Sequence, residues 1–325
     1  MATMAMLASC NNDNSLTEDK SLTPDNTAPT TASSGKACKS MILLQKELAS
    51  NPTARAKYNA SRAYADEYEN LVASGKVLAD GSVEIPVVIN VLYTGTADNV
   101  TDADAATQIS VLNKAYAATN SNYKSIPTEF KPVAAGDTKI KFKLIKVNRK
   151  KTTATDWLGD YTPSDVDSGG IDPTDNTRFL NIYVVPNLDY CGYASMPNQY
   201  GEAYDGVYIS RWCFGTRNVS SAYNMGITVV HEVGHYLGLE HTFGFDNKGC
   251  TTDYITDTPA TTENSGIPSY PLMIKCGGVN RSVMFMNYMD YCDDVANSMF
   301  TIKQKNKMNS VLAKSRLTIK NSSGI

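Results

Sequence analysis

The sequence predicts an α+β domain over residues 81–325, and three observations carry this prediction. Apolar segments of strand length, rich in β-branched residues, recur between residues 83 and 209. One long amphipathic helical pattern lies among them, and a second helical pattern opens the eleven-residue stretch His231–His241, which holds all three histidines of the 325-residue chain. With 42% hydrophobic and 19% charged residues, the chain can bury a core of single-domain size.

The first ten residues have the composition of a processing segment. Met1–Ser9 is apolar and small, without the positive start of a complete signal peptide, so we expect the translation start to lie upstream. Leu7-Ala8-Ser9-Cys10 resembles a bacterial lipobox, which predicts lipidation of Cys10. The alternative is an ordinary signal segment with an incidental cysteine.

Residues 11–36 and 37–80 differ sharply in composition. The first range is rich in Asn, Asp, Ser, Thr and Pro, which predicts a flexible polar tether. The second predicts two helices: a short one through Met41, Leu44 and Leu48, and a longer one capped by Asn51-Pro52. The longer helix has an apolar stripe, we expect Gly75 to end it, and Gly81 marks the boundary with the next domain. The stripe consists of Tyr64, Tyr68, Leu71 and Val72.

The predicted elements of the domain follow one another in a clear order. The capping box Thr101-x-x-Asp104 opens a helix with Ala105, Ile109, Leu112 and Tyr116 on its apolar face. A capping box at Thr301-x-x-Gln304 opens a C-terminal helix. The predicted strands are Val83–Tyr93, Lys139–Val147, Leu180–Val185, Tyr193–Met196 and Val207–Ile209.

Charge and hydropathy exclude two classes of partner. The formal net charge of −3 provides no electrostatic footprint for nucleic acid. The longest internal apolar stretch, Ile85–Tyr93, is too short to span a bilayer, so the only membrane contact expected is a lipid on Cys10. We expect a monomer.

The spacing of the histidines predicts a zinc site. On a helix, His231 and His235 lie on one face one turn apart, and Glu232 lies beside them as general base toward a zinc-bound water. His241 would point about 120° away if the helix continued, so the helix must end near Gly238. Three imidazoles leave an open catalytic position on the metal.

The motif HExxHxxGxxH, with the later Asn287-Tyr-Met-Asp-Tyr291, resembles the metzincin clan, and within it the pappalysin family and its bacterial cytophagalysin and ulilysin-like branch. The resemblance covers about residues 83–313. Its further motifs are Ile85-Pro-Val-Val, Gln108-Ile-x-Val-Leu-Asn113, Leu180-Asn-Ile-Tyr-Val, Gly192-Tyr-Ala and Asp257-Thr-Pro.

This resemblance implies a metzincin (zincin-like) catalytic domain. Its parts are a twisted mixed β-sheet, a long backing helix, an active-site helix and a smaller irregular C-terminal subdomain that ends in a helix. Met289 would form a hydrophobic floor under the zinc. Tyr291 would be a distant ligand or a hydroxyl donor to the oxyanion, the alternative being a tyrosine with no such role. An upper-rim edge strand would bind extended peptide; it is formed by Gly192, Tyr193, Ala194 and Ser195.

Two further positions are compared with relatives. Asp253, Asp257 and Thr258 match a segment that binds calcium in some relatives, the alternative being a solvated acidic loop. Val295 stands where some relatives have an acidic residue that selects Lys or Arg, so a preference for basic residues is not supported. Ala296 stands where many relatives have a cysteine.

Seven cysteines leave six for pairing if Cys10 is lipidated. We expect the disulfides Cys191–Cys213 and Cys250–Cys276 in an exported protein. The segment Ala37-Cys38-Lys-Ser-Met resembles a propeptide motif of the family, in which Cys38 would bind zinc and make residues 37–80 a latency segment. Proteolysis near Lys76 or Arg62 would remove it. The alternatives are a Cys38–Cys292 disulfide or an uncoordinated thiol.

Together these features predict a zinc endopeptidase made as a latent zymogen. It would be exported and act on protein or peptide substrates, either secreted or held at the cell surface or outer membrane as a lipoprotein. The alternative from another class is a catalytically inert, zinc-containing surface binding lipoprotein.

Overall fold

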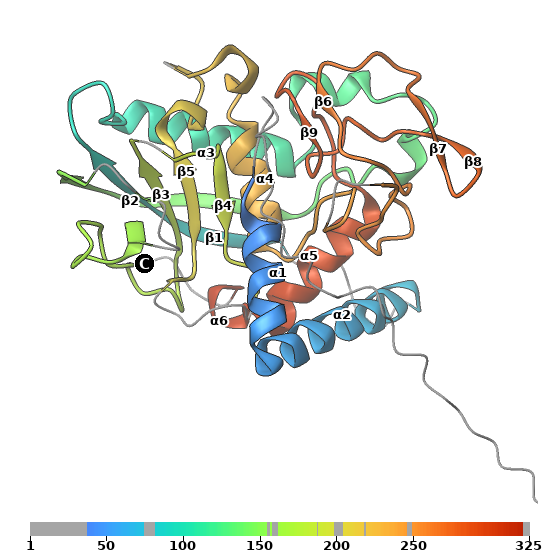
Figure 1. Cartoon of the computed structure of the whole chain (residues 1–325), viewed down its shortest axis with the longest axis horizontal. Coiled ribbons are helices and arrows are strands. Elements are labelled where there is room, and N and C mark those ends of the chain that lie inside the picture. The colour runs from blue at the N-terminus through green and yellow to red at the C-terminus, as the bar shows by residue number, and fades with distance from the viewer. Residues whose placement is uncertain are drawn as a thin grey trace, which may run out of the picture. The chain divides into compact units, whose positions relative to one another are not determined.

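The structure is a computed structural model that describes residues 38–74, 82–154, 157, 162–186, 188–197, 204–217, 219–245 and 249–320. All of them belong to one compact unit, Ala32–Ile325 (Figure 1). The predictions for Cys10, for the tether 11–36, for Lys76 and for the glycines Gly75 and Gly81 lie outside these residues. Among the described residues, none of the helices combines the length and the hydropathy needed to cross a membrane.

The unit is built around a five-stranded sheet with the strand order β2-β1-β3-β5-β4. β1, β2, β3 and β5 are parallel, and the edge strand β4 is antiparallel to β5, which makes the sheet mixed. The strands are β1 (Val83–Tyr93), β2 (Ile140–Lys151), β3 (Leu180–Val185), β4 (Gly192–Ala194) and β5 (Val207–Ser210). The predicted α+β class is therefore confirmed.

Two of the strands end two or more residues away from the predicted position. β2 continues to Lys151, beyond the predicted end at Val147, because β1 offers it backbone partners as far as Tyr93. The edge strand β4 begins at Gly192 and ends at Ala194, not at Met196. Pairing with a neighbour sets where a strand ends, and the amphipathic pattern alone does not contain that information.

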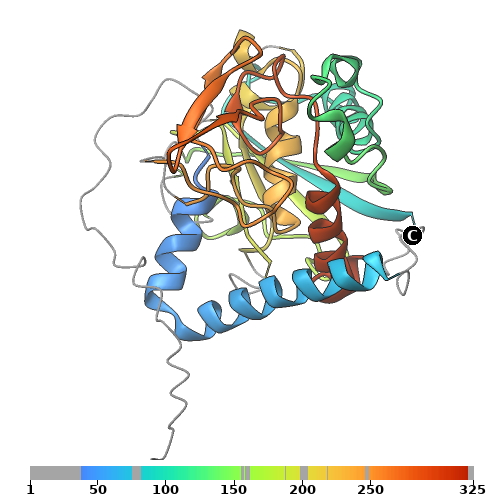
Figure 2. The same cartoon turned by 90° about the vertical axis from the view of Figure 1, so that its right-hand side faces the viewer.

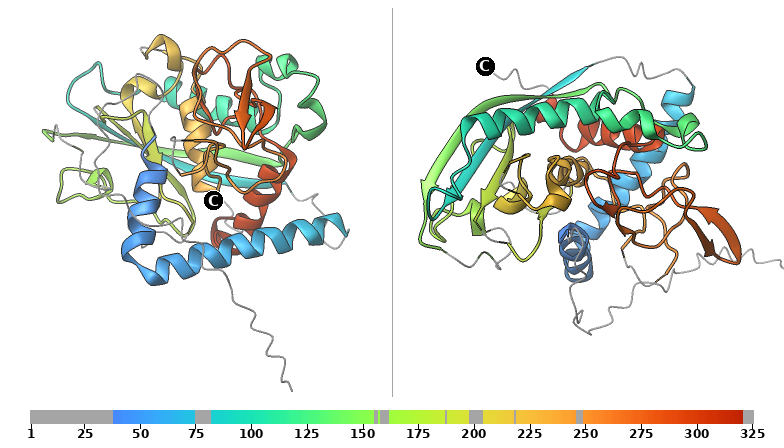
Figure 3. Two further views of the ribbon diagram at one scale, coloured as in Figure 1. Left: turned by 45° about the vertical axis from the view of Figure 1, so that its right-hand side comes forward. Right: turned by 90° about the horizontal axis from the view of Figure 1, so that it is seen from above.

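Two helices of the domain, α3 (Asp102–Tyr116) and α4 (Ile227–Tyr236), pack on the same face of the sheet (Figure 3). α3 begins with the predicted capping box of Thr101 and Asp104. α4 crosses beside it, and Gln108 Nε2 donates to Gly226 O (2.9 Å) at the start of α4. Burial of both helices and this sheet face in one hydrophobic core places α4 rigidly.

The opposite face of the sheet carries a separate cluster with stacked tyrosines. The Tyr208 ring lies between those of Tyr183 and Tyr193, with centroid distances of 4.9 and 4.7 Å. Leu43 of α1 (Ser40–Ser50) packs into this cluster. The side chain of Tyr193 thus points into the protein, so only the backbone of this residue is available at the edge of β4.

The N-terminal segment (residues 38–74) consists of two helices that meet at Asn51. The Asn51 side chain accepts hydrogen bonds from Thr53 N and Ala54 N (both 3.1 Å), as expected for a helix cap. α2 (Pro52–Ala73) then packs against α5 (Ile302–Lys314) and crosses it, as Figures 1 and 2 show. Of the predicted apolar stripe, Tyr68 is buried and the other three residues are half-buried.

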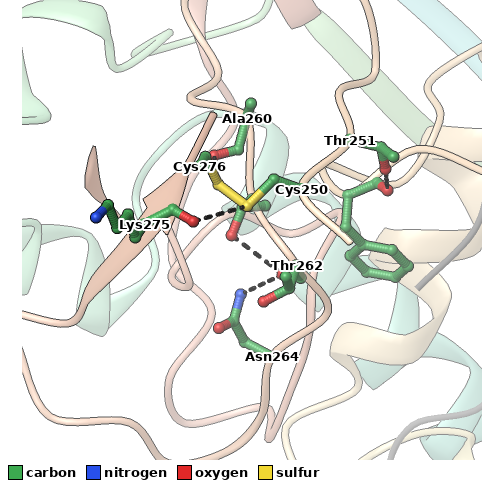
Figure 4. The surroundings of a disulfide bond; sticks show 9 residues. Cys250, Thr251, Ala260, Thr262, Asn264, Lys275 and Cys276 are labelled. Carbon is green, nitrogen blue, oxygen red and sulfur yellow. Dashed lines mark hydrogen bonds between the residues drawn. A yellow bond between two sulfur atoms is a disulfide. The ribbon is translucent and has the colours of Figure 1, made fainter. Parts of the chain in front are cut away.

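The C-terminal part is irregular, as predicted, and ends in α5 and the unpredicted short helix α6 (Leu317–Lys320). Thr301 and Gln304 form the expected capping box of α5. The disulfide Cys250–Cys276 ties the loop after His241 to β7 (Figure 4). The small strands are β6 (Ser265–Gly266), β7 (Met273–Cys276), β8 (Val279–Ser282) and β9 (Tyr291–Cys292).

The close approach of α4 to the loop 287–291 yields a stability prediction. A Cβ on Gly234 would lie 2.5 Å from Met289 Sδ, and the Met289 side chain is fully buried. Gly234→Ala is therefore expected to lower the free energy of unfolding by about 1–3 kcal/mol through overpacking, measured as a fall in Tm.

The matched control is Gly95→Ala, since a Cβ there would meet no atom within 4 Å. This control should leave Tm unchanged or slightly raised. If the two variants have equal Tm values, Met289 can retreat and the packing argument is wrong.

Candidate active site

The three histidines converge at the C-terminal end of α4. His231 and His235 lie one turn apart on α4, and all three imidazoles are buried. His235 Nε2 lies 3.1 Å from both His231 Nε2 and His241 Nε2. The expected grouping of these three side chains is therefore present in the structure.

Gly238 makes the turn that returns His241 to the site. α4 ends at Tyr236, and Gly238 has a φ of 89°, in the left-handed region that glycine adopts without strain. Gly238 N donates to His235 O (2.8 Å), which closes the turn. This matches the geometric expectation from the spacing of the three histidines.

Backbone carbonyls orient two of the imidazoles. His231 Nδ1 donates to Tyr288 O and His235 Nδ1 donates to Leu239 O, each at a distance of 2.7 Å. Since a carbonyl oxygen can only accept, Nδ1 carries the proton and the Nε2 lone pair faces the common centre. Such second partners are typical of metal-binding histidines.

Burial keeps these imidazoles neutral. Burial lowers the pKa of His235 to about 4, and the Lys307 ammonium lowers this pKa further. The hydrogen bond with Leu239 O raises the pKa but does not outweigh burial. Burial and the neighbouring His235 place the pKa of His241 well below its usual value. Neutral imidazoles are the form that binds a cation.

The donor set fits a zinc ion. In a tetrahedral site with Zn–N bonds of about 2.0–2.1 Å, the nitrogens lie about 3.3–3.4 Å apart, close to the 3.1 Å between the Nε2 atoms. Cys38 Sγ completes the group, since one ligand atom from each of the four residues lies within 4.8 Å of all the others. Three imidazoles and a sulfur are ligands that zinc prefers.

Glu232 is buried beside this centre and contacts the N-terminal segment. Its Oε2 accepts from Ser40 Oγ (3.1 Å) and from Cys38 Sγ (3.3 Å). Burial raises the pKa of the Cys38 thiol well above its usual value, and the Glu232 carboxylate raises it further. The carboxylate is thus engaged by two side chains that belong to one short stretch of chain.

Met289 and Tyr291 lie where the resemblance implies. Met289 packs under α4 at Gly234 and is fully buried. The Tyr291 ring lies 4.6 Å from the His241 ring between centroids. Its hydroxyl donates to Cys38 O (3.0 Å) and accepts from Cys38 N (3.4 Å).

The N-terminal segment also occupies the edge of β4. Lys39 N donates to Gly192 O (3.1 Å), and Ala194 N donates to Ser40 Oγ (2.8 Å). The segment runs parallel to β4 at Cys38 and Gly192. The backbone groups predicted to bind an extended peptide are therefore engaged by the chain itself. Ser195 differs, because its hydroxyl donates to Asp205 Oδ1 (2.6 Å).

The residues compared with a calcium-binding segment make contacts of their own. Thr258 Oγ1 donates to Asp253 Oδ1 (2.6 Å), and burial raises the pKa of Asp253 to about 7. Asp257 instead caps α5, accepting from Thr301 Oγ1 (2.7 Å) and Lys303 N (2.9 Å). Calcium binding stays a prediction. Val295 is about half exposed, with 53% of its surface accessible.

The two expected disulfides, Cys191–Cys213 and Cys250–Cys276, are both present. Cys38 and Cys292 form no disulfide, and Cys38 lies at the histidine cluster. The alternative of a Cys38–Cys292 bond is therefore wrong for this structure.

Three contacts were not expected from the sequence. Ser40 bridges Glu232 and Ala194, although Ser40 lies in the quoted Cys38 motif. Tyr58 OH donates to the buried Glu240 (2.8 Å), the residue before His241. A glutamate directly before a predicted metal ligand, in an otherwise apolar stretch, is a signal that could have indicated a buried partner. The third contact is made by Arg316, for which no sequence pattern was available.

Comparison with known proteins agrees with this geometry. A family profile, peptidase M43 with the description pregnancy-associated plasma protein-A, matches residues 165–313. An extracellular metalloprotease of Arthroderma benhamiae is 30% identical over 262 residues, covering 76% of this chain and 86% of the relative.

Two solved structures from Tannerella forsythia are similar to the chain. Mature mirolysin in complex with a cleaved peptide is 33% identical with a TM-score of 0.71, covering 74% of this chain and 97% of mirolysin. A promirolysin mutant is 31% identical with a TM-score of 0.74, covering 87% of this chain and 97% of its own. The chain therefore belongs to the pappalysin family of metzincin zinc metalloproteases.

Proposed function

We propose that this metalloprotease is an exported endopeptidase made as a zymogen, with Glu232 as general base and Cys38 as the blocking ligand. One observation carries the proposal. A single stretch, residues 38–40, contacts the histidine cluster, the candidate base, Tyr291 and the edge of β4 together. A segment that satisfies all of these groups leaves no room for a substrate.

His231, His235 and His241 would hold the zinc ion. When bound, zinc lowers the pKa of a coordinated water to about 7 and polarises the scissile carbonyl. Once Cys38 and Ser40 leave, Glu232 Oε2 can accept the proton of the attacking water and deliver it to the leaving amine. The Tyr291 hydroxyl, released from the Cys38 backbone, can donate to the developing oxyanion.

Peptide substrates would bind by adding a strand to β4. The Gly192 carbonyl and the Ala194 amide already make such contacts with Lys39 and Ser40. An extended peptide can replace them with its own backbone, which is β-augmentation. The structure of mature mirolysin in complex with a cleaved peptide supports peptides as the substrates of this chain.

A second anchor, formed by contacts outside the zinc site, binds the N-terminal segment to the catalytic domain. Tyr58 OH bonds to Glu240, Glu69 pairs with Lys303 (2.8 Å), and the Arg62 guanidinium lies 3.8 Å from the Tyr254 ring centroid. α2 therefore contributes to the affinity of the segment for the catalytic domain. The greater coverage by promirolysin than by mature mirolysin supports a removable segment here.

Export is supported by the names of relatives, which are called extracellular metalloproteases. Lipidation of Cys10 remains part of the proposal. An inert binding protein is disfavoured, because the base and the metal ligands are all retained and buried together.

Replacing Glu232 by glutamine tests the catalytic role. Glu232→Gln keeps the size of the side chain but removes the base, so kcat of the activated enzyme, freed of the N-terminal segment by proteolysis, should fall by about 10²–10⁴-fold on a denatured protein substrate. Wild-type activity should be lost with a chelator and restored by zinc.

Zinc content by metal analysis is the control, and it should be the same in both proteins. If Glu232→Gln hydrolyses the substrate as fast as the wild type, the mechanism is wrong. If neither protein has chelator-sensitive activity after proteolytic removal of the N-terminal segment, the inert alternative is favoured.

Replacing Cys38 by alanine tests latency. Cys38→Ala removes the sulfur from the histidine cluster, so the unprocessed chain should hydrolyse peptides without prior cleavage, whereas the wild-type precursor should not. The measurement is hydrolysis by the intact chain, with its mass checked after the assay. Ser50→Ala, at an exposed site on α1, is the matched control and should stay latent. A latent Cys38→Ala precursor would rule out the switch.

Loss of one hydroxyl tests the second anchor. Tyr58→Phe leaves the buried Glu240 carboxylate without its tyrosine donor, so a peptide comprising residues 37–74 should inhibit the activated enzyme less well when it carries this substitution. A hydrogen bond to a charged group is worth about 1.5–3 kcal/mol, so Ki should rise by about tenfold or more. Tyr64→Phe, which keeps the ring that lies near Lys314, is the control with unchanged Ki. Equal Ki values for both peptides would refute the anchor.

A further inference from the structure

Arg316 is a buried arginine outside the residues that the family profile matches. It lies between α5 and α6, and only 5% of its surface is accessible. Its guanidinium reaches three separate parts of the fold, namely the end of α4, the end of β4 and Asp205 just before β5. Both α4 and β4 form the active site.

At α4, Arg316 satisfies the end of the active-site helix. Arg316 Nε donates to Tyr236 O (2.8 Å), and Tyr236 is the last residue of α4. The last carbonyls of a helix lack partners within the helix and attract a cation. The guanidinium carbon also lies 3.4 Å from the Tyr236 ring centroid. Arg316 thereby holds the residue that directly follows His235.

At β4, the same guanidinium fixes the end of the edge strand. Arg316 binds both oxygens of Asp205, and its Nη2 to Asp205 Oδ1 distance is 2.8 Å. Asp205 Oδ1 accepts from Ser195 Oγ (2.6 Å), and Arg316 Nη2 donates to Ser195 O (3.4 Å). Ser195 directly follows Ala194, whose amide binds the N-terminal segment. The two-pronged contact between the Arg316 guanidinium and Asp205, here called the fork, therefore sets the position of the end of β4 relative to α4.

Packing around this fork is close. A Cβ on Gly238 would lie 2.8 Å from Val311 of α5 and 3.5 Å from Pro197, which follows β4. The ends of α4 and β4 thus meet on the C-terminal helix. A buried ion pair is by itself weak evidence for a contribution to stability, because desolvation offsets the attraction. Its planar two-pronged geometry, however, sets the relative position of the groups that it joins.

We propose that Arg316 is a positioning residue for substrate binding, which aligns the Ser195 end of β4 with the zinc-binding helix. It touches no reacting atom. Its effect is expected on peptides long enough to pair with β4 beyond Ala194, and not on short peptides that contact only the zinc centre and Gly192. The inference adds a residue to the proposed peptide-binding mode and rests on that mode.

The test measures kcat and KM on a series of peptides of increasing length around one scissile bond. Arg316→Lys keeps the charge but lacks the fork, and Asp205→Asn keeps the shape but lacks the charge. In the activated enzyme, each should raise KM for the longest peptide by about tenfold, the equivalent of one charge-assisted hydrogen bond. kcat, and all constants for the shortest peptide, should change little. The double variant should be no worse than either single variant, because both break one unit.

Lys305→Gln is the matched control, since Lys305 lies on α5 but its ammonium binds Asp137 O, away from the site. It should behave as the wild type at all lengths. Equal losses for short and long peptides, or a fall in kcat alone, would overturn the proposal, as would wild-type kinetics in Arg316→Lys and Asp205→Asn. Zinc content and Tm show whether each variant is folded. An inactive wild type after activation would instead refute the proposed function, and with it the peptide-binding mode on which this proposal rests.

Discussion

The convergence of three buried imidazoles, in which His235 Nε2 lies 3.1 Å from each of the other two Nε2 atoms, is the constraint on which the rest of this structure depends. A helix can place only two of them on one face, so α4 has to end directly after His235. Gly238 allows that end, and the returning chain carries His241 and Glu240 into the interior. The neighbouring elements then have to provide hydrogen-bond partners for a helix end and a loop that are both buried. Tyr288 and Leu239 do so through carbonyls that fix the imidazole orientation.

In the proposed zymogen, the same polar groups would serve two states of the enzyme. In this structure Glu232, Tyr291 and the β4 edge all bond to residues 38–40, so the segment satisfies the buried polar groups of the cleft. A substrate has to supply equivalent partners when it replaces the segment. A protease whose cleft is filled by a removable segment of its own chain can therefore be latent without a different arrangement of its catalytic residues. Ser40 fills two of these positions at once, because its hydroxyl bonds to both the candidate base Glu232 and the candidate substrate-binding strand β4.

The sequence predicted what depends on local periodicity and on motif spacing. β1, α3, the caps of α2 and α5, and the turn at Gly238 all follow from patterns within a few residues. The ends of β2 and β4 did not, because their partners β1 and β5 are separate segments of the chain. The Tyr58–Glu240 and Arg316–Asp205 contacts were equally out of reach, since they join residues 182 and 111 positions apart. Nothing in the neighbourhood of Arg316 distinguishes it from a surface arginine.

The C-terminal helix pair explains why these distant contacts gather where they do. α5 places Lys307 against Glu240 (3.4 Å) and Lys303 against Glu69, so it contacts both the zinc loop and the N-terminal segment. Arg316, just beyond α5, contacts the end of α4 and the end of β4. None of these Arg316 contacts involves the N-terminal segment, whereas the Tyr58 hydroxyl that bonds to Glu240 belongs to it. If the segment is removed as proposed, the buried Glu240 carboxylate would keep Lys307 and lose Tyr58, which would link loss of the segment to the loop that carries His241.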